Sequence, residues 1–403
     1  MKKLDVCIVG YGTAGQAAAI SLSRDGHRVT VYERVPNPGP VGAGFLLQPT
    51  GMSVLRQLGL LGQALQLGRR IDRLYGENAS GRPVMDMRYA SLSEDFYGLG
   101  LQRGAIFQML DGAWNEGRDL RDGVCIVHAD VETGHVTDSN GERHGPYDLV
   151  IAADGAGSRL RKDLPSIRYD KAYPWGALWC LLPALEWPHF NELRQRYRKC
   201  SQMAGLLPVG RRLDDDREML SFFWSVETSK FRDFDAERFT EMKLDLIALW
   251  PECAGIMTAL NQASQLACAS YRDTILGKTW FSGRLVAIGD SAHAMSPQLG
   301  QGVNMALLDA MALRNALRVP APLPSQLADY SSRRRKHVAV YQKWSRWLTP
   351  LFQSHHLLAA IARDGLFYPL GKLPVARTSM LKVLTGTAQG LFGRIELDDD
   401  PVR

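Results

Sequence analysis

The fold of this chain is decided by residues 9–33, VGYGTAGQAAAISLSRDGHRVTVYE, which hold the glycines Gly10, Gly12 and Gly15. The preceding apolar run, LDVCIVG, is typical of a buried parallel strand. The Ala- and Leu-rich part after the glycines predicts a helix, and HRVTVYE predicts a second strand. Strand, glycine turn, helix and strand in this order indicate a dinucleotide-binding unit.

Each glycine of the turn has a separate predicted task. Gly10 allows the tight turn, Gly12 lets the backbone approach a pyrophosphate, and Gly15 lets the helix pack close to the strand. The N-terminus of the helix then faces the phosphates. Glu33 ends the second strand, where a carboxylate can bind both hydroxyls of an adenosine ribose and would repel a 2′-phosphate. The stretch therefore disfavours NADP here and leaves NAD and FAD undecided.

Composition sets wide bounds. The chain has 403 residues, 45% of them apolar and 22% charged, which is an ordinary globular balance and enough for two or three subdomains. The net charge of +6 suits an anionic cofactor, a nucleic acid or a membrane surface and decides among none of them. We expect neither a signal peptide nor a membrane-spanning helix. The six cysteines include no C-x-x-C pair, so we expect no disulfide scaffold, no zinc site and a reducing, cytoplasmic setting.

Two later segments also join an apolar strand to a carboxylate and a glycine. They are YDLVIAADGAGSRLRK (147–162), with Asp154, and GRLVAIGDSAHAMSPQLGQGVNMALLDAMAL (283–313), with Asp290. Ligands of open parallel sheets bind at the carboxyl ends of the strands, so three such ends indicate one long ligand. The glycine loop and helix after Asp290 suit an electron-rich group such as a reduced isoalloxazine ring. If Asp290 only capped a turn, the coincidence of three strand ends would be unexplained.

The three segments resemble the fingerprints of the single-component FAD-dependent aromatic hydroxylases, the para-hydroxybenzoate hydroxylase-like family. GYGTAG with the later glutamate is similar to the adenosine motif, and DGAGSRLR is similar to the D-G-x-x-S-x-x-R motif. GDSAHAMSPQLGQGVNMALLDA is similar to the G-D-x-A-H-x-x-x-P-x-x-G-Q-G-x-N motif, and the resemblance extends to about Tyr330. It implies an α/β fold in which a Rossmann-like FAD-binding domain is interleaved with an antiparallel-sheet substrate domain, followed by C-terminal helices.

The expected domains are discontinuous. Residues 1–75, 100–165 and 275–330 would form the FAD-binding domain, residues 76–99 and 166–274 the substrate-binding domain, and residues 331–403 a C-terminal helical segment. The strings WGALWCLLP, MAGLLPVG and MLSFFWSV in the middle region are typical of antiparallel strands.

The resemblance also implies the cofactor-binding residues. Glu33 would bind the adenosine ribose, Arg103 would lie near the pyrophosphate, and Asp290 would hold the ribityl chain. Pro297 would lie beside the flavin, and the backbone of residues 299–303 would face its pyrimidine edge. Asp154 and Arg161 would support the pyrophosphate region, with NAD(P)H as a further candidate ligand there. The complete expected set is Gly10, Gly12, Ala14, Gly15, Glu33, Arg34, Arg103, Asp154, Arg161, Asp290, Pro297, Gly300, Gln301, Gly302, Val303 and Asn304.

Aromatic residues of the middle region can serve either packing or substrate binding. We expect most of them to form a core face against the FAD domain. The alternative is that Trp179, Phe222 and Trp224 line an apolar substrate pocket over the flavin.

No catalytic acid or base stands out in the sequence. Tyr173, Tyr271 and Arg272 are weak catalytic candidates, each more simply explained as packed or exposed. His293 belongs to the flavin motif, where we expect a structural role. The histidine pair His355 and His356 has no matching ligand set, so we expect no metal site.

The tail begins with SRRRKHVAVYQKWSRWLTPLF after Tyr330. Its apolar residues between Trp344 and Phe352 recur at helical spacing, and its arginine cluster suggests a solvated helix face. We expect the segment to pack on the enzyme's own surface, with no nucleic acid bound. Membrane contact is disfavoured, and a membrane surface or an acidic partner is the alternative, because basic amphipathic helices can lie on lipid. The tail resembles, more loosely, the helical extensions of quinone-biosynthesis hydroxylases.

The resemblance implies an enzyme, an FAD-dependent monooxygenase and thus an oxidoreductase. NADH or NADPH would reduce the flavin as a transient reductant, and O₂ would give a C4a-hydroperoxide that hydroxylates an aromatic or lipophilic ring substrate. The alternatives are an FAD-dependent oxidoreductase without oxygen transfer and a non-catalytic FAD-fold binding protein. A flavin halogenase is disfavoured, because WGALWCLLP has the wrong spacing for the W-x-W-x-I-P stretch of that class. The expected partners are a small-molecule substrate and O₂, on a monomer or homodimer.

Overall fold

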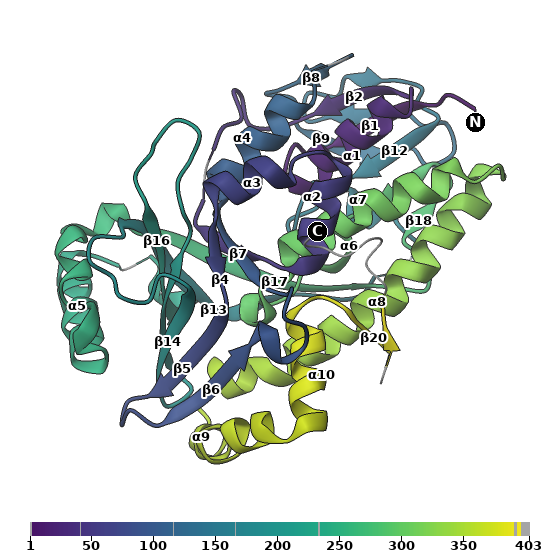
Figure 1. Cartoon of the computed structure of the whole chain (residues 1–403). Helices are drawn as coiled ribbons and strands as arrows, with labels where there is room; N and C mark the ends of the chain where they lie inside the picture. The colour runs from purple at the N-terminus through teal and green to yellow at the C-terminus, as the bar shows by residue number, and fades with distance from the viewer. Residues whose placement is uncertain are drawn as a thin grey trace.

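The computed structural model describes residues 2–40, 42–115, 117–165, 167–232, 234–390 and 393–395. Its upper layer in Figure 1 is a six-stranded sheet of order β18-β19-β12-β1-β2-β8. The strands are β1 (Asp5–Val9), β2 (Arg28–Tyr32), β8 (Asp119–Arg121), β12 (Leu149–Ala152), β18 (Phe281–Ser282) and β19 (Leu285–Ala287). β1 pairs in parallel with β2 and β12, and β12 pairs in parallel with β19. The dinucleotide-binding unit expected from the glycine turn is therefore present.

Helices bury this sheet, which explains why β12 and β19 are apolar along their whole length and β1 is apolar after Asp5. The helices of this half are α1 (Thr13–Arg24), α2 (Pro49–Gln57), α3 (Leu61–Leu67), α4 (Arg103–Ala113), α6 (Asp290–His293) and α7 (Gly302–Arg318). Helices α1 and α7 pack on each other. The largest apolar cluster of the molecule includes the buried faces of the sheet and of these helices.

The second large sheet has seven strands in the order β17-β13-β16-β15-β14-β5-β6. They are β5 (Arg73–Asn78), β6 (Pro83–Arg88), β13 (Ile167–Pro183), β14 (Glu192–Arg198), β15 (Gln202–Pro208), β16 (Met219–Glu227) and β17 (Ala267–Leu276). All neighbours are antiparallel except β14 and β5, which are parallel. Helix α5 (Ala236–Leu249) packs on one face of this sheet, at the left of Figure 1. The expected antiparallel substrate sheet is confirmed, with this one exception in its pairing.

Two smaller sheets accompany the two large ones. Strands β3 (Gly44–Leu47), β7 (Gly98–Gln102) and β4 (Arg69–Ile71) form a three-stranded sheet, and β9 (Ile126–Ala129), β10 (Val136–Asp138) and β11 (Arg143–His144) form another. Short 3₁₀ turns span Tyr89–Ser91, Leu160–Asp163, Thr228–Lys230, Pro251–Cys253, Ile256–Ala259, Ala263–Gln265 and Pro297–Leu299.

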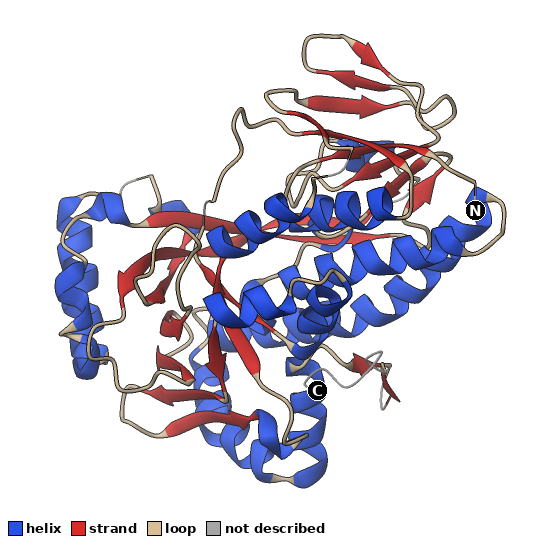
Figure 2. Cartoon of the chain, turned by 45° about the horizontal axis from the view of Figure 1, so that its top comes forward, coloured by secondary structure: helices blue, strands red, loops and turns tan. Residues whose placement is uncertain are grey.

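Three helices complete the described chain. They are α8 (Leu323–Phe352), α9 (Leu357–Lys372) and α10 (Pro374–Leu384), followed by β20 (Ala388–Gln389) and β21 (Gly393–Arg394). Helix α8 runs without a break across residue 331, where a new segment was expected, and packs on α7. Figure 1 places α9 at the bottom of the molecule, away from the six-stranded sheet, and the turned view of Figure 2 also shows helices at its lower end. Among the described residues, no helix is long and apolar enough to cross a membrane.

Candidate active site

The glycine turn after β1 is closed at two glycines and open at the third. Gly10 has φ +105°, and a Cβ there would stand 2.4 Å from the Ala153 carbonyl oxygen. A Cβ on Gly15 would stand 2.0 Å from the Gly10 carbonyl oxygen. By contrast, a Cβ on the exposed Gly12 would meet no heavy atom within 4 Å. The backbone is therefore tightly packed on the protein side and accessible at Gly12, as a pyrophosphate cradle requires.

Glu33 closes one side of this turn. Its carboxylate accepts hydrogen bonds from the Tyr11 N–H (2.8 Å) and the Val35 N–H (2.9 Å). Arg34, the next residue, is exposed. Glu33 thus lies beside the cradle, and its expected contact with a ribose stays a prediction.

Arg103 begins α4 and is exposed. A Cβ on Gly42 would stand 2.7 Å from its Cδ, so the arginine crosses that glycine closely. Burial raises the pKa of Tyr271 to about 12, and the charge of Arg103 acts in the opposite direction. This coupling indicates that Arg103 and Tyr271 are near each other, although they are far apart in the sequence.

The second strand end carries an unsatisfied carboxylate oxygen. Asp154 Oδ2 accepts a hydrogen bond from the Arg159 N–H at 2.8 Å. Asp154 Oδ1 is buried and has no partner among the described residues. Gly155 follows with φ +78° and open space around its Cβ position. Buried acceptors are normally satisfied, so this oxygen points to a donor that a ligand or water would supply.

Arg161 joins the second strand end to the third. It is 2% exposed. Its guanidinium donates to the carbonyl oxygens of Ala156 (2.9 Å), Ser291 (2.9 Å) and Asp290 (3.2 Å) and to Asp170 Oδ2 (3.0 Å). The side chain is thus fully occupied by protein acceptors. It fixes the two loops relative to each other, and any direct contact with NAD(P)H stays a prediction.

The third strand end has its open side at Asp290. Gly289 has φ +62°, and a Cβ there would stand 3.1 Å from Ala14 Cβ, so this turn lies directly against α1. The Asp290 side chain is exposed, and the start of α7 is beside it, since a Cβ on Gly302 would stand 3.9 Å from Asp290 Oδ1. Pro297, Gly300 and Gly302 are exposed around the same loop. The three strand ends therefore meet at one edge of the sheet.

Two polar residues of the loop face inward instead. Gln301 is buried and donates from Nε2 to the Leu384 carbonyl oxygen at 2.6 Å. Asn304 accepts from the Gln48 N–H at 2.8 Å and donates to the Leu46 carbonyl oxygen at 3.3 Å. These side chains hold the loop to the C-terminal turn and to β3, while Val303 between them is half-buried.

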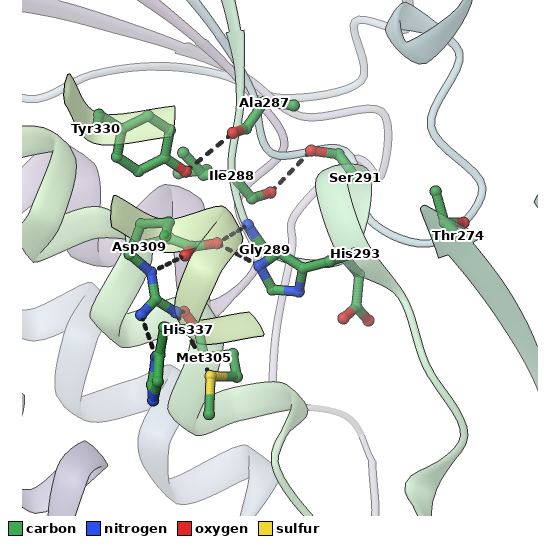
Figure 3. Close-up of polar contacts among 12 residues, drawn as sticks. Thr274, Ala287, Ile288, Gly289, Ser291, His293, Met305, Asp309, Tyr330 and His337 are labelled. Atoms are coloured by element: carbon green, nitrogen blue, oxygen red, sulfur yellow. Dashed lines mark hydrogen bonds and ion pairs between the residues drawn. The ribbon is translucent and has the colours of Figure 1, made fainter. Parts of the chain in front are cut away.

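A buried carboxylate stands behind the third strand end (Figure 3). Asp309 is fully buried and accepts from the Gly289 N–H (2.7 Å), His293 Nε2 (2.6 Å) and Arg334 Nε (2.6 Å). Burial alone would raise the pKa of Asp309, but the charges of His293 and Arg334 outweigh burial and lower it to about 2. His293 is 1% exposed, and its contacts support a structural position behind the loop.

Arg334 extends this network to the turn that follows α10. Its NH1 donates to His337 Nδ1 (2.6 Å), so His337 donates from Nε2 to the Gly386 carbonyl oxygen (3.0 Å). Burial and the neighbouring Arg334 lower the pKa of His337 to about 3, which keeps this imidazole neutral. The expectation that the arginine cluster is a solvated face is wrong for Arg334, which is 6% exposed, because it neutralises Asp309.

The substrate-pocket prediction was wrong for two of its three aromatic residues. Phe222 and Trp224 belong to the apolar cluster under α5, on the outer face of the seven-stranded sheet. Phe222 is completely buried there. Side chains alternate between the faces of a strand, and the Gly44 N–H donates to Ser221 Oγ at 3.1 Å, so Ser221 marks the face toward β3. The sequence favoured the face of β16 that carries Phe222 and Trp224, whereas the inward face carries Ser221, Phe223 and Ser225.

Phe223 lies on the opposite face of β16 from Phe222. It pairs with Trp179 across β13 and β16, so these two share the inner face. Phe223 and Leu299, from the loop before α7, pack on the same apolar cluster as Phe352. The wall nearest the loop therefore includes Phe223 and Leu299, which the sequence analysis did not assign to substrate binding.

The three weak catalytic candidates have different surroundings. Tyr173 has a buried hydroxyl without a hydrogen bond among the described residues, and burial raises its pKa. Tyr271 is near Arg103, as above. Arg272 pairs with Asp170, which also binds Arg161. Arg272 is thus part of a structural ion-pair cluster, and a catalytic role for any of the three stays a prediction.

Asp309 and Arg334 were also missed by the sequence analysis. The signal for Asp309 was available, because an acidic residue inside the apolar run NMALLDAMAL must be either exposed or paired. Arg334 carried no such signal within SRRRK, where neighbouring basic residues are equivalent until the helix phase is known.

Comparisons with known proteins agree with this geometry. Residues 3–345 match a protein family whose description is "FAD binding domain". The FAD-dependent urate hydroxylase of Mycolicibacterium vanbaalenii is 29% identical over 356 residues, covering 83% of this chain and 85% of the relative. The 6-hydroxynicotinate 3-monooxygenase of Pseudomonas fluorescens is 26% identical over 380 residues, covering 85% and 91%. The solved tetrameric form of 2-methyl-3-hydroxypyridine-5-carboxylic acid oxygenase has a TM-score of 0.79 at 20% identity, covering 95% and 97%.

Proposed function

This chain belongs to the FAD binding domain family and is an FAD-dependent aromatic monooxygenase of that family. From this premise we propose that it uses NAD(P)H and O₂ to hydroxylate an electron-rich heteroaromatic ring. The observation that carries this proposal is the meeting of three strand ends at one open edge, with an apolar wall beside it. The ring class is inferred from the names of the relatives, since urate, hydroxynicotinate and hydroxypyridine are all nitrogen heterocycles.

The residues at this edge fit FAD. The accessible backbone at Gly12 suits the pyrophosphate, and Asp154 Oδ1 lacks a donor that the ligand or an ordered water can supply. The exposed Asp290 would accept hydrogen bonds from the ribityl hydroxyls, and Glu33 from the adenosine ribose. The N-terminus of α7 would stabilise negative charge on the ring. When bound, FAD supplies the redox chemistry that links NAD(P)H and O₂ to the substrate.

The chain's own residues would orient the substrate and exclude water. Phe223 and Leu299 are partly buried apolar residues between the loop and the sheet. A wall that excludes water favours oxygen transfer to the substrate, because water in the site promotes release of H₂O₂ without hydroxylation. We also propose a division of the chain that follows approximately the two large sheets. Residues 1–75, 100–165 and 275–330 would bind FAD, and residues 76–99 and 166–274 would bind the substrate.

The cofactor part of the proposal is tested with Asp290→Ala. A hydrogen bond to a charged acceptor contributes roughly 1.5–3 kcal/mol, so FAD affinity should fall by about ten- to a hundredfold, as measured by flavin fluorescence titration. The flavin should also leave the wild-type protein on acid precipitation, because only non-covalent contacts hold it. Unchanged affinity in a folded variant would remove Asp290 from the site.

The reaction is tested with ¹⁸O₂. A panel of hydroxylated pyridines, quinolones and purines should contain a compound that accelerates NAD(P)H oxidation and gains one labelled oxygen atom. Conversion at the same rate without O₂ would instead support the FAD-dependent oxidoreductase. A colourless protein that takes up no FAD would support the non-catalytic binding protein.

A further inference from the structure

Helix α9 turns apolar side chains toward solvent. Its five exposed large residues are Leu357, Leu358, Ile361, Leu366 and Leu370. Leu358 is 80% exposed and Ile361 is 61% exposed, so these side chains do not pack on the molecule. Within α9, all of whose residues the structure describes, the only exposed charged residue is Lys372 at the last position. The outer side of this helix is therefore an uncharged apolar surface.

The charges of α9 are used on its inner side. Arg363 is 2% exposed and donates to Asp364 Oδ1 (2.6 Å) and to the Leu351 carbonyl oxygen (3.1 Å). Its guanidinium also lies 4.9 Å from the centre of the Tyr197 ring. Asp364 in turn accepts from Asn78 Nδ2 at 2.9 Å. These contacts fix the rotation of the helix, so its leucines must stay outside.

The apolar surface continues into the next helix. Leu373 is 56% exposed and Val375, in the first turn of α10, is 77% exposed. We call the five exposed residues of α9 together with Leu373 and Val375 the α9 face. Of the sixteen large apolar residues that are exposed in the described chain, seven belong to it. A concentration of this kind marks an interaction surface, whereas single exposed leucines are ordinary.

The charge of the surrounding segment selects the partner. Residues 331–390 contain ten lysines and arginines and one acidic residue, and four of these arginines are held in ion pairs with Asp273, Asp309, Asp329 and Asp364. Lys343, Lys372 and Arg377 are exposed on α8, α9 and α10. A second copy meeting this face would bring two basic segments together, which like-charge repulsion disfavours. An anionic apolar surface is complementary in both respects.

We propose that the α9 face docks this enzyme on a bilayer surface that contains anionic phospholipids. A helix with an apolar outer side and basic flanks lies in the interface plane, with its apolar residues at the boundary between headgroups and acyl chains. Trp347, exposed near the end of α8, has the amphipathic ring that favours this depth. The proposal does not depend on the proposed reaction. It favours the membrane alternative that the sequence analysis placed second, on an apolar surface of α9 that the stripe of α8 does not include.

The test uses the full-length, FAD-loaded protein and flotation with phosphatidylcholine vesicles, with and without phosphatidylglycerol. The wild type should float with the anionic vesicles, and added salt should weaken this binding. The variant Leu358→Glu/Ile361→Glu should lower the partition coefficient by about a hundredfold, because two apolar side chains are replaced by carboxylates. Leu244→Glu is the matched control, because Leu244 is 65% exposed on the distant helix α5. Flavin absorbance and the melting temperature verify that each variant is folded.

Three outcomes would overturn the proposal. The wild type could fail to float with anionic vesicles. The double variant could float as well as the wild type or as the Leu244→Glu control. Sedimentation velocity could show a lipid-independent dimer that the double variant abolishes, in which case the face serves a second copy of this chain.

Discussion

The buried carboxylate of Asp309 gives the sharpest test of how the third strand end is held. We consider Asp309→Asn, which keeps the shape of the side chain and removes its charge. Three donors converge on this carboxylate, from Gly289, His293 and Arg334, all within 2.7 Å. The amide nitrogen of an asparagine would face at least one of these donors, and Arg334 would remain buried without its counter-charge.

The expected cost follows from burial. Asp309 is fully buried and the Arg334 side chain is 7% exposed, so water cannot replace the lost partner. Removing one member of such a pair costs about 3–5 kcal/mol, whereas replacing the whole pair with apolar groups is often close to neutral. Arg334→Met/Asp309→Asn should therefore recover about 2 kcal/mol or more of the loss from Asp309→Asn alone. FAD affinity should fall in the single variant too, because a neutral amide holds the Gly289 N–H, beside Asp290, less strongly than a carboxylate does.

The assay is urea unfolding followed by far-ultraviolet circular dichroism, on the wild type, both single variants and the double variant. Asp25→Asn is a useful comparison, because Asp25 pairs with Arg314 and Arg318 nearer the surface. This variant should lose less of the free energy of unfolding than Asp309→Asn. An Asp309→Asn protein within about 1 kcal/mol of the wild type would refute the reasoning. A double variant that is no more stable than Asp309→Asn would refute the assigned partner.

Three further predictions concern single residues. Gly12→Val should reduce FAD affinity by more than about a hundredfold in fluorescence titrations, because its side chain would fill the open cradle, and a folded, fully yellow variant would contradict this. Phe222→Ala should lower the free energy of unfolding by about 3–5 kcal/mol with little change in substrate KM. Phe223→Ala should raise the substrate KM. The reverse pattern would mean that the faces of β16 are misassigned. His337 has its pKa lowered from 6.5 to about 3, so the unfolded state binds its proton first and stability falls as the pH drops from about 6.5 toward 3. His337→Gln should remove up to ~1.4 kcal/mol per pH unit of that slope, and equal slopes for both proteins in urea unfolding at pH 6 and 5 would exclude the assignment.

The parts of the fold that could be predicted depend on local constraints. Gly10 and Gly15 are required because a Cβ at either position would collide with a backbone oxygen, and such requirements are visible in the sequence as spaced glycines. Parallel pairing of three strands then follows from their apolar runs, and their carboxyl ends must meet at one edge.

What could not be predicted depends on long-range packing. The phase of β16 is set by Ser221 bonding to Gly44, a contact between residues 177 positions apart. The burial of Arg334 is set by Asp309 on another helix. The α9 face was missed for the same reason, because the rotation of α9 depends on where Arg363 finds the Leu351 carbonyl and the Tyr197 ring.

The hydrogen bonds from Gln301 to Leu384 and from His337 to Gly386 also bear on the order in which the protein matures. During synthesis, domains generally fold in the order in which they leave the ribosome. Here the loop that follows Asp290 receives its final support from residues more than eighty positions later. The nucleotide-binding half can therefore collapse early, but its flavin loop stays incomplete until the C-terminal turn has been made. We expect nascent chains lacking the residues after 380 to remain apoprotein, and FAD uptake to be a late, post-translational event.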